Sequence, residues 1–148
     1  MDLTAFSTQA TVEARASSAR VKLWTDKNKD GTPDPDTLTQ GFQFATGLIF
    51  EKLQQRYGET ELASWTISTA PARILRISDD LCMWVFSSGL NAQNPLIQVI
   101  YDEAIQSLDD IASTKVSLYG ATEGVTLTSS TEAPDDPFDR TYFNEVFP

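Results

Sequence analysis

Three stretches of the chain repeat apolar residues every three or four positions, and each is bounded by residues that start or stop a helix. The first follows Asp34 or Asp36, ends at Tyr57-Gly58 and has the stripe Leu38, Phe42, Ala45, Leu48, Ile49 and Leu53. The second opens at Pro71, stops near Gly89 and has the stripe Ile74, Ile77, Leu81 and Val85, widened by Trp84. The third opens at Asn94-Pro95, runs through Ala112 and has the stripe Ile97, Ile100, Tyr101, Ala104, Leu108 and Ile111. These patterns predict amphipathic helices around a shared core.

A fourth helix is expected from Gln9 to Trp24, because this stretch lacks Gly and Pro and places Val12, Ala16, Ala19 and Leu23 on one stripe. Glu59 to Ala70 is expected to be a crossover or packed loop. The fold class is therefore mainly α, a small bundle of about four helices. Lys115 to Tyr119 and Gly124 to Leu127 could each add a short β-strand.

The charge distribution divides the 148 residues into a helical domain, residues 1–119, and an acidic spacer with a terminal arm, residues 120–148. From Gly120 onward there are six acids and one base, and the Ser/Thr- and Pro-containing stretch from Thr128 to Pro137 has the composition of an extended segment. Large apolar residues return at the end: Phe138, Tyr142, Phe143, Val146 and Phe147. They could fold back onto their own bundle, or they could form an arm that docks, with Arg140, into grooves of another subunit. The acidic spacer favours the docking arm.

The residue chemistry argues against an enzyme. The chain has no histidine and a single cysteine, Cys82, which reads as a core residue between Leu81 and Met83. It contains no GxxxxGK[ST], GxGxxG or GxSxG motif, and zinc chemistry lacks ligands. The paired acids Asp79-Asp80, Asp102-Glu103 and Asp109-Asp110 are interpreted as solvated helix faces. No catalytic residue and no organic cofactor are predicted.

The formal charge of -10 disfavours tight binding of nucleic acid. The longest strongly apolar stretch, Leu81 to Phe86, is too short for a membrane span, and the N-terminus does not resemble a signal peptide. We therefore expect a protein that is made in a cytoplasm and has no membrane partner.

An acidic loop between the predicted helix from Gln9 to Trp24 and the predicted helix that ends at Tyr57-Gly58 has the spacing of the first half of a calcium loop. Oxygen-bearing side chains occur at alternate positions around Gly31, namely Asp26, Asn28, Asp30, Thr32, Asp34 and Asp36. Thr37 stands where such loops carry a bidentate glutamate, and Lys27 and Lys29 offset part of the acidic charge. Weak structural calcium binding and a metal-free Asx-turn loop that caps the next helix are both compatible with this pattern.

The order of these features resembles a known family. Leu23-Trp24-Thr25-Asp26-x-Asn28-x-Asp30-Gly31-x-x-Asp34 is followed by a helix to Arg56-Tyr57-Gly58, then by Pro71-x-x-Ile74-Leu75-x-Ile77-x-x-Asp80, then by a Tyr101-centred helix that closes on Lys115-x-x-Leu118. Over roughly residues 10–119, with a weaker echo from Phe138 to Phe143, this combination is similar to bacteriophage head-tail connector proteins of the adaptor, or head-tail joining, type, in the Mu-like phage branch.

The resemblance implies a structural virion protein whose subunits form a ring, commonly a dodecamer, under the portal protein at the capsid vertex. Such a ring extends the DNA channel, lets DNA pass without tight binding, and offers a docking surface to the next neck or tail-completion protein. The terminal arm, here Thr128 to Pro148, would reach the portal. About ten extra N-terminal residues and the long spacer after Tyr119 depart from the family pattern. The alternative is a small cytoplasmic interaction module with a calcium-binding DxNxDG loop and a C-terminal linear motif.

Overall fold

The computed structural model describes residues 3–88, 94–113 and 118, and these residues contain six helices and no strand. The chain divides into two units, residues 1–116 and 117–148, and all six helices belong to the first. The mainly α fold is therefore confirmed. The predicted strands at 115–119 and 124–127 and the predicted C-terminal arm lie, apart from Leu118, outside the described residues. The predicted domain boundary after residue 119 stays a prediction.

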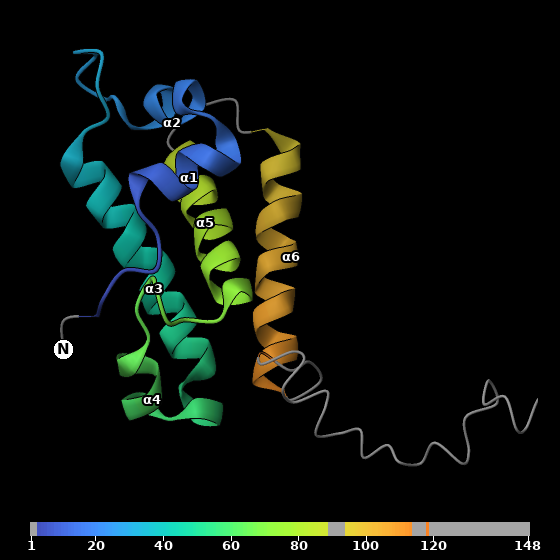
Figure 1. Cartoon of the computed structure of the whole chain (residues 1–148). Helices are drawn as coiled ribbons and strands as arrows, with labels where there is room; N and C mark the ends of the chain where they lie inside the picture. Colours follow the sequence, from blue (N-terminus) through green and yellow to red (C-terminus); the bar gives the residue numbers. More distant parts are fainter. Residues whose placement is uncertain (1–2, 89–93, 114–117, 119–148) are drawn as a thin grey trace, which may run out of the picture. The chain divides into compact units, whose positions relative to one another are not determined.

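Three long helices form the centre of the first unit: α3 (Pro35–Tyr57), α5 (Ala72–Ser87) and α6 (Pro95–Ala112). Each packs against the other two. In Figure 1 they are the teal (α3), yellow-green (α5) and yellow to orange (α6) ribbons. Their starts follow the sequence signals, because Pro35 and Pro95 lie in the first turns and the Asn94 side chain accepts a hydrogen bond from the Leu96 N–H at 2.9 Å. Most of the predicted stripe residues form the core, including Ile49, Leu53, Ile74, Leu81 and Leu108.

The predicted helix from Gln9 to Trp24 is wrong in its continuity, since the structure has two helices there, α1 (Gln9–Ala16) and α2 (Ser18–Thr25). Ser17 separates them with a φ of 103°, and its side chain accepts a hydrogen bond from the Arg20 N–H. The break rotates the second half of the expected stripe. Val21 and Trp24 are buried on α2, whereas Leu23 is 66% exposed.

The expected loop from Glu59 to Ala70 contains a short helix, α4 (Glu59–Ser64), which packs on α3. Gly58, with a φ of 76°, reverses the chain between α3 and α4. Leu62 and Trp65 are buried, so this segment contributes to the core as well as connecting α3 to α5.

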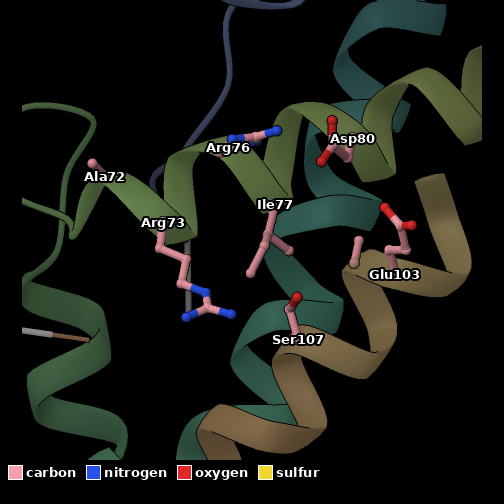
Figure 2. Close-up of a pocket in the computed structure, with 8 residues that line it drawn as sticks. Ala72, Arg73, Arg76, Ile77, Asp80, Glu103 and Ser107 are labelled. Atoms are coloured by element: carbon pink, nitrogen blue, oxygen red, sulfur yellow. The ribbon is translucent and has the colours of Figure 1, made fainter. Parts of the chain in front are cut away.

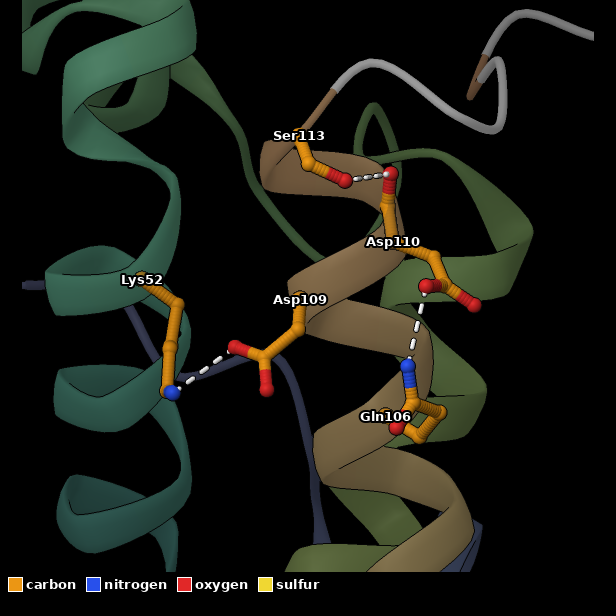
Figure 3. A network of polar contacts seen from close by, with 5 residues as sticks. All are labelled: Lys52, Gln106, Asp109, Asp110 and Ser113. Atoms are coloured by element: carbon orange, nitrogen blue, oxygen red, sulfur yellow. Dashed lines mark hydrogen bonds and ion pairs between the residues drawn. The ribbon is translucent and has the colours of Figure 1, made fainter.

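Polar contacts join helices that are far apart in sequence. Lys52 of α3 forms an ion pair with Asp109 of α6 at 2.8 Å, and Figure 3 shows it beside the hydrogen bond between Gln106 and Asp110. A second ion pair joins Arg15 of α1 to Asp80 of α5. The exposed Lys52 pair is expected to add at most about 1 kcal/mol to the free energy of unfolding.

No described helix has the length and apolar character that crossing a membrane requires.

Candidate functional site

The acidic loop between α2 and α3 is held in a tight coil by its own carboxylates. Asp26 accepts hydrogen bonds from the backbone N–H groups of Asp30, at 3.0 Å, and Gly31, at 2.9 Å. The Asp34 carboxylate accepts the Lys27 N–H at 3.0 Å, and the Asp34 N–H bonds the Thr25 carbonyl. These bonds close the loop across its whole length, as the Asx-turn interpretation predicts.

The coil brings three of the six predicted ligands together. One carboxylate oxygen from each of Asp26, Asp30 and Asp34 lies within 4.8 Å of the other two. Hydrogen bonds from the Thr32 hydroxyl and backbone N–H lower the pKa of Asp30 below its usual value of 3.8, which keeps this exposed carboxylate charged. Three converging carboxylates match the oxygen donors that calcium prefers, although they supply only part of its usual six to eight ligands.

The other three predicted ligands have different positions. The Asn28 side chain accepts the Asp30 N–H at 3.1 Å, and the Thr32 hydroxyl donates to Asp30, so both side chains stabilise the loop through hydrogen bonds. Asp36 lies in the first turn of α3 and is not a member of the carboxylate group. Asp34 precedes α3 but makes no side-chain cap bond, because its carboxylate is used by Lys27.

A groove beside this loop was not predicted from the sequence. It has a volume of about 740 Å³ and is lined by α2 and loop residues: Ala19, Lys22, Leu23, Trp24, Asp26, Lys27 and Lys29. Ala19 and Leu23 belong to the predicted apolar stripe, but both are exposed because the helix breaks at Ser17. The sequence feature that indicates this break is the pair Ser17-Ser18, since serine is favoured at helix caps over helix interiors.

A second hollow, of about 490 Å³, lies between α5 and α6. Figure 2 shows Arg73 and Ile77 of α5 facing the side on which Glu103 and Ser107 of α6 lie. Asp80 completes a lining of mixed charge, with arginines toward one end and acids toward the other. This lining contains no thiol or imidazole.

The interpretation of Asp79-Asp80 as a solvated pair is wrong. Both residues are buried, and the side chains that contact them, Thr11 and Arg15, come from α1. Asp79 accepts a hydrogen bond from the Thr11 hydroxyl at 2.8 Å, and Asp80 accepts one from Arg15. Burial raises the pKa of both carboxyl groups, while these hydrogen bonds oppose the rise. The pair holds α1 against α5, and Asp102, Glu103 and Asp109 are exposed as expected.

Cys82 is buried, as predicted, and its thiol lies 3.6 Å from the Gly41 carbonyl oxygen. Burial raises the pKa of the thiol to about 12, so the thiolate needed for nucleophilic chemistry does not form near neutral pH. The predicted partner-binding residues Phe138, Arg140, Tyr142, Phe143, Val146 and Phe147 lie outside the described residues.

No curated protein and no solved structure matches this chain significantly. A family model does match, over residues 6–134, and its description is "Bacteriophage Mu, Gp36". The match includes all six helices, the acidic loop and most of the acidic spacer. Because it spans most of the sequence, the chain belongs to the bacteriophage Mu Gp36 family.

Proposed function

We propose that this phage protein is a structural, non-enzymatic subunit of the head-tail connector. The family match over residues 6–134 is the observation that carries the proposal. It places in a phage Mu family the same helices and acidic loop whose sequence resembles the adaptor proteins of Mu-like phages. In the proposal, copies of the chain form a ring under the portal protein. The ring extends the DNA channel and presents a docking surface to the next neck or tail protein, in a virion assembled in the host cytoplasm.

The charge of the chain suits a channel wall. A formal charge of -10 per subunit repels phosphate, so DNA can pass in either direction without being held. A closed ring also requires a heterologous interface, in which one patch of a subunit fits a different patch of its neighbour. The apolar end of the sequence, with Phe138, Tyr142, Phe143 and Phe147, supplies residue types that dominate such interfaces.

The proposal is tested by the assembly state of the purified full chain. We expect light scattering to give a mass many times the subunit mass of 16.4 kDa and negative-stain images to show an annulus. The matched measurement is the same sample with calcium or with a chelator. A monomer whose state changes only with calcium would contradict the connector and favour the small interaction module.

Calcium binding by the acidic loop is a second, smaller function that one observation favours. The carboxylates of Asp26, Asp30 and Asp34 converge within 4.8 Å of one another. Because Thr37 replaces the bidentate glutamate, we propose a weak site that stiffens the loop, with a dissociation constant of about 10⁻⁴ to 10⁻³ M.

Calorimetric titration of the full chain with calcium chloride tests this site. Asp30→Asn removes one converging carboxylate and is expected to weaken binding about tenfold or more. Glu51→Gln is the control, since it removes the same charge from an exposed position on α3, outside the loop. Equal affinities for the two variants, or no heat of binding in the unaltered chain, would leave the Asx-turn loop as the sole role of these acids.

A further inference from the structure

The groove between α2 and the acidic loop combines an apolar floor with basic edges. Leu23 and Trp24 supply the apolar part, and Leu23, at 66%, is the most exposed of the large apolar side chains in the described part of the chain. Figure 1 shows α2 and the loop at the end of the first unit opposite α4. At about 740 Å³, the groove could receive several side chains of an extended peptide.

The groove differs in charge from the rest of the protein. Three lysines, Lys22, Lys27 and Lys29, line it together with one acid, Asp26, which leaves a local charge of +2 in a chain of formal charge -10. All three lysines are exposed, and none forms an ion pair with another described residue. An occupant that is both acidic and apolar would therefore complement the groove.

The C-terminal sequence of the chain has this composition. Residues 135–147 contain four acids, Asp135, Asp136, Asp139 and Glu145, against the single base Arg140, which gives a charge of -3. The same stretch contains the five large apolar residues Phe138, Tyr142, Phe143, Val146 and Phe147. Its aromatic side chains match the Leu23–Trp24 floor, and its acids match the three lysines.

We infer that this groove binds the C-terminal segment, residues 135–147, of a second copy of the chain. The inference rests on the proposed function, because a ring needs a patch on each subunit that receives a different patch of its neighbour. Phe138 lies twenty positions after Leu118, a distance of at most about 70 Å when the chain is extended, so the sequence is long enough to reach an adjacent subunit. The arm would then close the ring, and contact with the portal would come from another surface.

Disulfide trapping between two full-length variants tests the pairing directly. Leu23→Cys is mixed with Tyr142→Cys under mild oxidation, and Cys82 stays silent because it is buried. A cross-linked heterodimer is expected, and in this mixture it can join only different molecules. Leu96→Cys replaces Leu23→Cys in the control, because Leu96 is similarly exposed, at 60%, but lies on α6. Cross-linking no better than that of Leu96→Cys would overturn the inference.

The double variant, with both cysteines in one chain, separates a second copy from the chain's own end. Cross-linked dimers and larger species support docking on a neighbour. A cross-linked monomer alone would show that each segment occupies its own groove, and this outcome also overturns the inference.

Charge exchange tests the electrostatic part in the full chain. Lys22→Glu, Lys27→Glu and Lys29→Glu together are expected to weaken self-association at least tenfold, and adding Asp135→Lys, Asp136→Lys and Asp139→Lys is expected to restore it. The control reverses three exposed arginines outside the groove, Arg20, Arg73 and Arg76. If an annulus of unaltered stability forms with the lysines reversed, the docking inference fails while the connector remains. If the unaltered chain forms no annulus, the connector proposal fails.

Discussion

Gly41 lies on α3 at the point where the ring of Phe86 from α5 contacts the helix backbone. A Cβ atom at this position would overlap the ring, and Phe86 cannot swing outward because it is buried and packs edge-on against Phe42. The thiol of Cys82 approaches the carbonyl of the same glycine. The close packing of α3 on α5 therefore depends on one missing methyl group.

Gly41 and Gly47 lie on the same helix, α3, in different surroundings. Gly41→Ala is expected to lower the free energy of unfolding by about 1 to 3 kcal/mol, because the added methyl overpacks the core by more than the gain in helix propensity. Gly47→Ala is the control, since nothing lies within 4 Å of its added Cβ, and it is expected to raise the free energy of unfolding by about 0.5 to 1 kcal/mol. Urea denaturation measures both changes. A stabilised Gly41→Ala protein would show that the two helices are not held at this distance.

The sequence indicates local contacts between residues near the candidate site better than contacts between distant residues. The spacing around Gly31 indicated a tight loop with six candidate ligands but left calcium binding and a metal-free Asx-turn loop both open, and only Asp26, Asp30 and Asp34 converge. The coil itself could be expected because local hydrogen bonds between neighbouring residues close it. The burial of Asp80 was not predictable in the same way. Its partner Arg15 is 65 positions away on α1, and an acidic pair has no local signal for such a contact.

Among the elements, the long helices could be predicted and the short ones could not. The helices α3, α5 and α6 each have four or more turns and their apolar stripes cover more than three, so the periodic signal is much larger than the effect of any one residue. The break between α1 and α2 depends on one residue, Ser17, with a positive φ. The residues on both sides have a helical composition, so the sequence predicts one continuous helix. The groove was not predicted for the same reason, because the break at Ser17 is what exposes Leu23.

Packing against the rest of the bundle explains why α1 and α2 are separate helices. A continuous helix from Gln9 could not place Val12 and Ala16 as well as Val21 and Trp24 against the rest of the bundle in the observed arrangement. The break lets α1 and α2 each pack on α5, with a capping box formed by Thr8 and Thr11 at the start of α1. The cost of a strained Ser17 is offset by this additional burial.

At the scale of the whole molecule, the net charge of -10 and the two buried aspartates make stability depend on pH in the same direction. Burial raises the pKa of Asp79 above 3.8, so above pH 3.8 the folded state holds this proton more tightly than the unfolded state does. The resulting stabilisation is complete below pH 3.8 and is lost as the pH rises through the raised pKa. Asp30 has the opposite sign, because its lowered pKa adds stability that is lost as the pH falls.

The effect of the buried Asp79 carboxyl group on stability can be separated from that of the overall charge. Asp79→Asn keeps an oxygen that can accept the Thr11 hydroxyl but removes the titration, so the decrease in the free energy of unfolding between pH 4 and pH 7 is expected to be smaller than in the unaltered chain. Asp102→Asn is the control, because it removes the same charge from an exposed position on α6 and should leave most of the decrease in place. Urea midpoints measured across this pH range give both slopes. The comparison of slopes remains valid even if Asp79→Asn lowers stability at every pH, because a constant loss does not change the slope. Equal slopes for Asp79→Asn and the unaltered chain would mean that burial does not hold this proton, and the pH dependence would then belong to the surface charge alone.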